Sequence, residues 1–277
     1  MRIQGTFSIR KPLTKENDLR RSHEPNERKK FARAFRLNRE GFQKLQAIIG
    51  PQIEKDPSMA KRSSGGPIEI STRLAICLRY LAGGSLLDSS MSFGVEEVTA
   101  WSIANDVIAA INSKLRIETG YDNKENLHII SKDFMESQKC PLFGWVGAVD
   151  GVVVKIQQPR LSECNNPSSY FNRKNYFGIP VQAVADSWYE FLYFSSKCAG
   201  STADSTAFEV TSLSEYLHSS GIPRGFWLAG DEAYACGRNL ITAWPSSSLT
   251  DERRTFNHTL STLRVHVEQA FGMIVFR

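Results

Sequence analysis

The hydrophobic positions in the first half of the chain follow the three-to-four-residue spacing of amphipathic helices. From about residue 31 to residue 130 this pattern predicts helices and no strands. Asn38 is a suitable N-cap for the first clear helix, and Gly50-Pro51 is its expected stop. The expected apolar face of this helix consists of Phe42, Leu45, Ile48 and Ile49.

Residues 85–111 predict a short helix, a turn at Gly94 and a longer helix, which together have the outline of a helix-turn-helix. The expected apolar stripe of the longer helix is Val98, Trp101, Ala104, Ile108 and Ile111. A recognition helix reads bases with its N-terminal residues, whereas this helix begins with Glu96 and Glu97, which phosphates repel. We therefore expect a small all-α, helix-turn-helix-like domain over residues 31–130 that does not itself read bases.

Beyond Pro141 the pattern changes to short apolar runs of strand length. The expected strands cover residues 145–156, 178–188, 189–200, 225–235 and 240–244. The second and third follow each other directly, which predicts a hairpin. A helix is expected over residues 201–217, and a final helix has its apolar face at Leu260, Leu263, Val267, Ala270, Phe271 and Ile274. This order predicts an α/β domain with a mixed sheet over residues 131–277.

One acid interrupts the first of these strands. In the segment GAVDGVVVKI, residues 147–156, Asp150 lies between two apolar runs. Asp-Gly is the commonest hairpin signal, so a turn is one interpretation. The other interpretation is that the carboxylate is paired or bound to a cation, because a lone buried carboxylate is costly. The strand by itself leaves both interpretations open.

Composition excludes several classes of protein. The chain has 277 residues, of which 41% are hydrophobic and 23% charged, as in soluble globular proteins. No apolar run approaches the ~18 residues of a membrane span, so no membrane association is expected. The five cysteines are scattered and form no C-x-x-C pair, which argues against a disulfide framework or a zinc site.

The positive charge of the chain is concentrated at its start. The 34 Lys and Arg residues exceed the 29 Asp and Glu residues by five, and residues 1–30 alone hold nine basic and four acidic residues. A basic segment with few apolar residues predicts a disordered tail. Such a tail can also hold a polyanion through counterion release.

Four carboxylates occupy the boundaries of the expected strands and helices or lie in the last helix: Asp150, Asp204, Asp231 and Glu268. Each has an ordinary explanation. Asp150 and Asp231 could be turn residues, and Asp204 could favour a helix N-terminus through the helix dipole. Glu268 could pair with Arg264, one helical turn earlier.

Taken together, the four acids indicate a shared site. If the first and fourth strands are neighbours, their acids lie side by side, and a helix packed on the sheet can direct Glu268 toward them. Several acids within a few ångströms cannot all stay ionised unless cations offset the repulsion. Hard divalent ions such as Mg²⁺ or Mn²⁺ suit such an oxygen-rich site.

Five segments, in order, resemble the DDE endonuclease domain of the PIF/Harbinger transposases and of the nucleases derived from them. The segments are GAVDGVVVKI, YFNRKNYFGIPVQAVAD, AGSTADSTAF, LAGDEAYA and RVHVEQAFG. The resemblance extends from about Phe31 to the end of the chain. It places Asp150 on the Asp of the family's D-G motif and Asp204 on that of G-S-x-x-D-S. It places Asp231 on the Asp of G-D-x-x-Y and Glu268 on the Glu of V-E-x-A-F-G.

The resemblance implies an RNase H-like fold and a divalent-metal-dependent DNA endonuclease or transposase that uses a two-metal mechanism. The expected catalytic residues are Asp150, Asp231 and Glu268, and the expected ligands of Mg²⁺ or Mn²⁺ are Asp150, Asp204, Asp231 and Glu268. Whether Asp204 or Asp231 is the middle aspartate of the triad stays open, since strand-end placement favours Asp231 and family usage often favours Asp204.

Basic residues and partners complete the expectation. Lys155, Arg173 and Lys174 are the expected contacts to DNA phosphates, and a solvated basic hairpin is the alternative for the last two. The resemblance implies action on transposon ends in the nucleus, with the cytoplasm as a second compartment. It also implies cooperation with a Myb-like DNA-binding protein, and a homo-oligomer stays open.

The chain departs from the family pattern in three places. Ala203 stands where the family commonly has His, and Val152–Val154 stand where a polar residue such as His often follows the D-G motif. The chain ends nine residues after Glu268, so the domain is expected to be truncated at its C-terminus. These departures motivate an alternative, a catalytically inactive transposase remnant that binds DNA or protein. A weaker alternative is an RNase H-like nuclease that acts on RNA.

Overall fold

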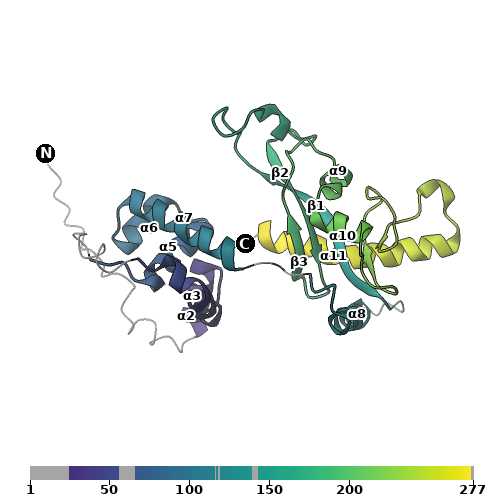
Figure 1. The fold of residues 1–277 in the computed structure, drawn as a ribbon, viewed down its shortest axis with the longest axis horizontal. Coiled ribbons are helices and arrows are strands. Elements are labelled where there is room, and N and C mark those ends of the chain that lie inside the picture. The colour runs from purple at the N-terminus through teal and green to yellow at the C-terminus, as the bar shows by residue number, and fades with distance from the viewer. Residues whose placement is uncertain (1–24, 56–65, 116, 118, 139–142, 276–277) are drawn as a thin grey trace. The chain divides into compact units, whose positions relative to one another are not determined.

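The computed structural model describes residues 25–55, 66–115, 117, 119–138 and 143–275. The chain forms two compact units, with the division at residue 117 (Figure 1). Helix α8 packs against the first strand of the sheet and so belongs to the second unit, which places the division earlier than the expected boundary at residue 131. None of the helices in the described ranges is long and apolar enough to cross a membrane.

The first unit is helical. Its helices are α2 (Pro25–Phe35), α3 (Arg39–Ile53), α5 (Ile70–Leu81), α6 (Leu86–Phe93) and α7 (Glu97–Lys114). Asn38 caps α3 as expected, because its side chain accepts a hydrogen bond of 2.7 Å from the Gly41 N–H. Gly94 ends α6 in the left-handed conformation, with φ 66°, which glycine adopts without strain.

Two helical expectations are wrong. Helix α3 does not stop at Gly50-Pro51 but continues to Ile53, because Ile49 and Ile53 are both buried and their packing outweighs the hydrogen bond that Pro51 removes. The buried residues of α7 are Ala100, Ile103, Ala104, Val107 and Ala110. The expected stripe was therefore rotated: the small alanines pack inward, while Val98 and Trp101 are exposed.

The expected basic tail overlaps a helix. Residues 25–30 belong to α2, and Phe31 and Phe35 on the same helix pack against Phe42 of α3. This aromatic contact stabilises α2, which includes the last residues of the expected tail. Residues 1–24 lie outside the described residues.

The second unit is built on one sheet. Its elements are α8 (Lys124–Gln138), β1 (Trp145–Lys155), η1 (Pro167–Tyr170), β2 (Gly178–Ala185), β3 (Phe191–Ser195), α9 (Asp204–Glu209), α10 (Ser212–His218), β4 (Trp227–Ala229), β5 (Leu240–Ile241), η2 (Ser246–Ser248) and α11 (Asp251–Val275). The strand order is β3-β2-β1-β4-β5. The first three strands are antiparallel, whereas β4 runs parallel to β1 and β5 parallel to β4. The mixed α/β sheet expected from the sequence is confirmed.

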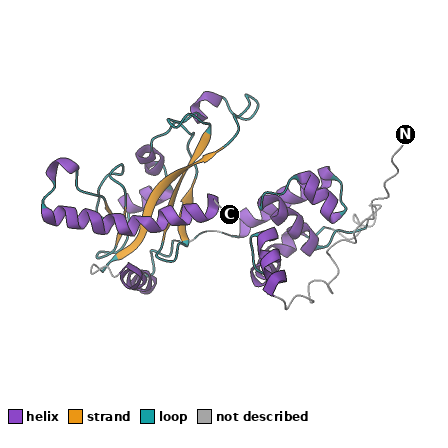
Figure 2. Cartoon of the chain, turned by 180° about the vertical axis from the view of Figure 1, so that it is seen from behind, coloured by secondary structure: helices purple, strands orange, loops and turns teal. Residues whose placement is uncertain are grey.

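Helices cover both faces of this sheet. Helix α11 runs across one face, as Figure 2 shows, and α9 and α10 lie on the other. The expected single helix over residues 201–217 is two, because Thr211 accepts a hydrogen bond from the Ser214 N–H and caps a new helix. The residues of α11 in the core are Leu260, Leu263, Val267, Ala270 and Phe271, whereas Ile274 is exposed.

Strand β1 answers the question that Asp150 raised. The strand is continuous through Asp150 and Gly151, which pair with Ala183 and Gln182 of β2, so the turn interpretation is wrong. On its other side β1 pairs with β4 only as far as Ala148, because β4 ends at Ala229. Asp150 therefore lies just beyond the end of β4, where burial along β1 also begins to fall.

Substitution of Leu263 tests how firmly α11 is held on the sheet. Leu263 is 0% exposed, so Leu263→Ala is expected to lower the free energy of unfolding by about 2–5 kcal/mol through lost burial and a residual cavity. The matched control is Val265→Ala on the same helix, where the side chain is 39% exposed and the loss should stay below about 1 kcal/mol. Urea unfolding followed by circular dichroism measures both, and equal losses would contradict the packing of this helix.

Candidate active site

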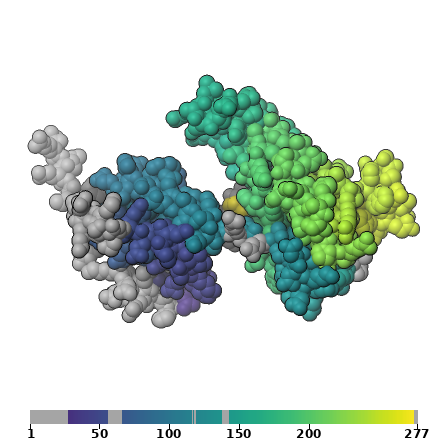
Figure 3. Space-filling model, viewed as in Figure 1, coloured from purple at the N-terminus to yellow at the C-terminus, as the bar shows by residue number. Residues whose placement is uncertain are grey.

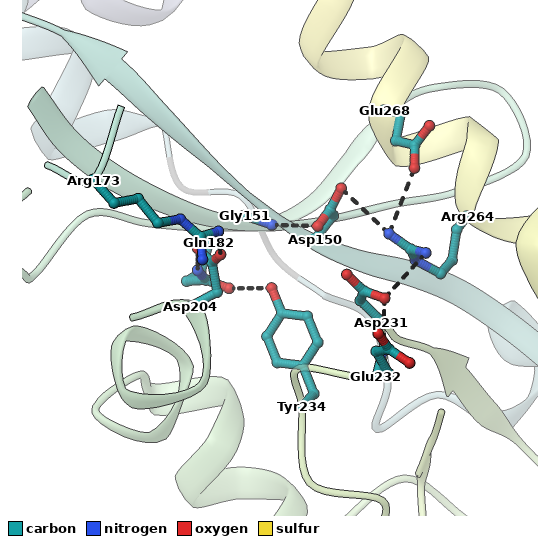
Figure 4. A network of polar contacts seen from close by, with 10 residues as sticks. All are labelled: Asp150, Gly151, Arg173, Gln182, Asp204, Asp231, Glu232, Tyr234, Arg264 and Glu268. Carbon is teal, nitrogen blue, oxygen red and sulfur yellow. Dashed lines mark hydrogen bonds and ion pairs between the residues drawn. The ribbon is translucent and has the colours of Figure 1, made fainter. Parts of the chain in front are cut away.

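Three of the four expected acids come together at the end of the short strand β4. Asp150 lies in β1, Asp231 follows β4 by two residues, and Glu268 lies on α11 (Figure 4). Because β1 and β4 are parallel neighbours, their acids lie at the same edge of the sheet. Helix α11, which crosses the sheet, supplies the third acid. We refer to Asp150, Asp231 and Glu268 as the acidic cluster.

The guanidinium of Arg264 lies at the centre of the acidic cluster. Its Nη2 is 3.8 Å from Oδ2 of Asp150 and 3.5 Å from Oε1 of Glu268, and its Nη1 is 3.4 Å from Oδ1 of Asp231. The Arg264 side chain is only 18% exposed, whereas that of Glu268 is 53% exposed. The expected pair of Glu268 with Arg264 therefore forms, but it is only one of the three contacts that Arg264 makes with the acidic cluster.

Asp150 is the least exposed acid of the cluster, and its surroundings disfavour its ionised form. Burial raises its pKa, and the negative charges of Glu268 and Asp231 raise it further. The Gly151 N–H, at 2.8 Å from Oδ1, and the charge of Arg264 act in the opposite direction without cancelling the rise. Ionised Asp150 therefore depends on a neighbouring positive charge.

Asp204 lies close to Gly151 of β1, on the opposite side of the strand from Asp150. Successive strand residues face opposite sides of a sheet. Asp150 points toward Arg264 on α11, whereas a Cβ added at Gly151 would lie 2.6 Å from Oδ1 of Asp204, at the start of α9. Asp204 pairs with Arg173, whose Nη2 is 3.7 Å from its Oδ2, and so has a different cation from the acidic cluster.

Two polar residues form a hydrogen-bonded chain from the loop after β4 to Asp204. The Tyr234 hydroxyl donates a hydrogen bond of 2.7 Å to Oε1 of Gln182, and Nε2 of Gln182 donates one of 3.4 Å to Oδ1 of Asp204. Burial raises the pKa of Tyr234, and Asp150 and Asp204 raise it further. Tyr234 therefore stays protonated and keeps its role as a donor.

Sequence reasoning missed Gln182 and Tyr234, and it expected Arg264 only as a partner of Glu268. All three lie inside the segments RVHVEQAFG, YFNRKNYFGIPVQAVAD and LAGDEAYA that carry the family resemblance. The available signal was therefore their position within these motifs, next to the acids.

The three basic residues expected at DNA phosphates lie in different surroundings. Arg173 is highly exposed and reaches Asp204. Nζ of Lys155 lies 5.9 Å from the centre of the Tyr176 ring. Lys155 is five residues from Asp150 along β1, which separates their backbones by about 16 Å at strand spacing. Lys174 is exposed, and its backbone N–H donates to Oδ1 of Asn172 at 2.7 Å. Of these residues, only Arg173 forms an ion pair with an expected metal ligand in the described structure.

The donor atoms of the acidic cluster suit a hard divalent cation. Carboxylate oxygens are the ligands that Mg²⁺ and Mn²⁺ prefer, and the three carboxylates already converge on one positive group. In the described ranges, no three His, Cys, Asp or Glu side chains are close enough to hold one ion in their present positions. The three carboxylates are thus chemically suited to bind a metal, and the Arg264 guanidinium lies between them.

Comparisons with known proteins agree with the motifs at a coarse level. Residues 149–277 match the model of a family described as DDE superfamily endonuclease, and this segment holds all four expected acids together with Arg264. The protein ALP1-like of Arabidopsis thaliana is 23% identical over 177 residues, which cover 64% of this chain and 42% of that protein. The chain therefore spans less than half the length of this curated relative. No solved structure matches the chain.

The raised pKa of Asp150 predicts a pH-dependent stability. Because the folded state binds this proton more tightly than the unfolded state, where the pKa is near 3.8, ionised Asp150 destabilises the fold at neutral pH. The penalty should be lost as the pH falls through the raised pKa toward the unfolded-state value of 3.8. The unfolding free energy of the wild type should therefore rise relative to that of Asp150→Asn over this window.

Urea unfolding at a series of pH values measures this difference. Asp251→Asn, in the exposed first turn of α11, is the matched control for loss of one carboxylate. A wild type that instead loses stability relative to Asp150→Asn as the pH falls would contradict the raised pKa.

Gly151 is expected to be required for its lack of a side chain. In Gly151→Ala the new methyl group would lie 2.6 Å from both Oδ1 of Asp204 and Nε2 of Gln182, so both groups must move. We expect a loss of unfolding free energy of about 1–3 kcal/mol. The control is Gly237→Ala, where a Cβ meets nothing within 4 Å and the change should stay within about 0.5 kcal/mol. Chemical denaturation measures both, and a neutral Gly151→Ala would exclude the close approach of Asp204.

Proposed function

We propose that the second unit is a divalent-metal-dependent DNA endonuclease of the DDE type, with an RNase H-like fold and of the PIF/Harbinger kind. The convergence of three carboxylates from β1, the end of β4 and α11 on one positive centre is the observation that carries this proposal. The match to the DDE superfamily endonuclease model over the same residues supports it.

Asp150, Asp231 and Glu268 would hold the metal, whereas Asp204, on the opposite side of β1, would not be a direct ligand of the same ion. A bound Mg²⁺ or Mn²⁺ would supply Lewis-acid chemistry for activation of a water or a DNA 3′-hydroxyl and for stabilisation of the leaving oxygen. The protein's own contribution is to fix these carboxylates at the end of β4 and to keep the polar network around them satisfied. Tyr234 and Gln182 do this for Asp204.

The distances favour Asp231 as the middle aspartate of the triad. Asp231 shares a guanidinium with Asp150, whereas Asp204 faces the opposite side of β1 and pairs with Arg173. The proposed catalytic residues are therefore Asp150, Asp231 and Glu268. Asp204 would take part through the network of Gln182 and Tyr234.

DNA is the proposed substrate, with Arg173 and Lys174 in the segment before β2 and Lys155 at the end of β1 as phosphate contacts. All three side chains are exposed and positively charged. Phosphate contacts of this type position a nucleic acid without reading its sequence. Sequence recognition would then come from elsewhere, in keeping with Glu96 and Glu97 at the start of α7.

The wider assignments rest on the family resemblance. They are a helix-turn-helix-like role for the first unit, action on transposon ends in the nucleus, a Myb-like DNA-binding partner, and assembly into a homo-oligomer. The short α6, the turn at Gly94 and the longer α7 are compatible with the first of these.

Nicking of supercoiled DNA tests the proposed activity. The wild type should nick DNA with Mn²⁺ or Mg²⁺ and not with EDTA. Asp150→Asn removes a proposed direct ligand and should reduce the rate by at least about 100-fold, because removal of even an outer-shell partner of a metal costs about 10–100-fold. Asp251→Asn, an exposed acid of the same unit, should leave the rate unchanged. A wild type that cannot be distinguished from Asp150→Asn would overturn the proposal.

The alternative function is a catalytically inactive remnant that binds DNA or protein. Ala203, next to Asp204, and the existing ion pairs of all four acids with Arg264 or Arg173 favour it. Calorimetry with Mn²⁺ separates the two functions. Binding that Asp150→Asn abolishes supports the nuclease, and the absence of binding together with DNA retention supports the remnant.

A further inference from the structure

The Arg264 contacts are longer than two other arginine–carboxylate pairs of the described residues and similar in length to the 3.7 Å contact of Arg173 with Asp204. Charge-assisted hydrogen bonds of arginine have donor–acceptor distances of about 2.7–2.9 Å. The pairs of Arg79 with Asp88 at 2.8 Å and of Arg73 with Asp106 at 2.9 Å are of this kind. The three contacts of Arg264 are 3.4–3.8 Å long. Its guanidinium is therefore centred among three acids without being tightly bound to any of them.

The guanidinium is also incompletely satisfied. Nε of Arg264 is buried and makes no hydrogen bond within the described part of the chain. A group that served only to lock α11 to the sheet would be expected to use this donor, because an unsatisfied buried donor costs free energy. We infer that Arg264 acts mainly through its positive charge, which lies near all three carboxylates of the acidic cluster.

The balance of charge around the site leaves room for a further cation. When ionised, the three carboxylates of the acidic cluster face one guanidinium, that of Arg264, so the cluster and Arg264 together carry a net charge of two negative units, three negative charges against one positive. This equals the charge of one divalent ion. The acidic cluster alone would carry three negative charges without Arg264.

We propose that Arg264 is a resident counter-cation that holds the acidic cluster together in the absence of metal and competes with a divalent ion for the same oxygens. The proposal rests on the function proposed above, because it assumes that the acidic cluster binds metal. It assigns Arg264 a positioning role, in which the loosely held guanidinium must yield part of its contacts when a metal ion binds.

Neutralising Arg264 should have opposite effects on the two states. Without its charge the three acids repel one another, so metal-free Arg264→Gln should unfold at a temperature lower by about 2–4 °C or more. The same change removes a like charge from the neighbourhood of the metal, so the dissociation constant for Mn²⁺ should fall at least about tenfold. If Arg264 only maintained the fold, Arg264→Gln would lower both the thermal stability of the metal-free protein and its affinity for Mn²⁺.

Thermal unfolding and calorimetry of the full chain, with and without Mn²⁺, test this role. The matched control is Arg254→Gln, which removes the same charge from an exposed position of α11 and should leave both quantities unchanged. Arg264→Lys keeps the charge and should retain a Mn²⁺ affinity close to that of the wild type. Added Mn²⁺ should raise the unfolding temperature of Arg264→Gln by more than that of the wild type.

The outcomes separate this inference from the proposed function. If the wild type binds Mn²⁺ in a manner that depends on Asp150 but Arg264→Gln binds it equally or more weakly, the counter-cation role is overturned and the nuclease proposal stands. If neither the wild type nor Arg264→Gln binds Mn²⁺, both are overturned. Tighter binding by Arg264→Gln alone supports the inference.

Discussion

Repulsion among three carboxylates governs the second unit of this protein. A guanidinium lies between their side chains, and the pKa of Asp150 is raised even so, first by burial and then by the charges of Glu268 and Asp231. A partly buried charge is tolerated when an opposite charge lies within a few ångströms, and is costly when that charge is removed. The sheet and α11 must therefore place Arg264 and the acids together or the site would be unstable.

Two features position Arg264 and the acids: the lengths of β1 and β4, and the direction in which each side of α11 faces. Strand β4 is short and ends at Ala229, which leaves Asp150 on the longer β1 open toward the loop that carries Asp231. On α11, Leu263 and Val267 are buried against the sheet. Each helical residue turns by about 100° from the last, so Arg264 and Glu268 lie together on the adjacent stripe. The apolar core thus fixes the direction in which these two side chains point.

Much of this architecture follows from patterns that act over short distances. Alternation and run length predict the hairpin of β2 and β3, and the apolar spacing of α11 predicts nearly all of its buried face. The errors arise where tertiary contacts outweigh such signals. Burial of Ile49 and Ile53 carries α3 past Pro51, and close packing of small residues, rather than the bulk of Trp101, sets the buried face of α7.

The arrangement of the acids could be predicted in part. Their gathering follows from the adjacency of β1 and β4, which is a condition of the prediction and which the structure supplies. The separation of Asp204 does not, because it depends on a single step along β1, from Asp150 to Gly151, that reverses the face of the sheet. The central place of Arg264 is hidden for a similar reason. Spacing along a helix predicts its pair with Glu268, but its contacts with Asp150 and Asp231 depend on how the helix crosses the sheet.

The choice of arginine fits a position shared among several acids. Its charge is delocalised over a planar fork with several donors, so one guanidinium can face three carboxylates from different elements at once. A lysine ammonium is a compact point charge that would approach one acid closely and leave the others less well compensated. The same delocalisation makes each single contact of Arg264 weak, as the distances of 3.4–3.8 Å indicate. A cation that is needed by the cluster as a whole, but held tightly by no member of it, can maintain the site and still be displaced from part of it.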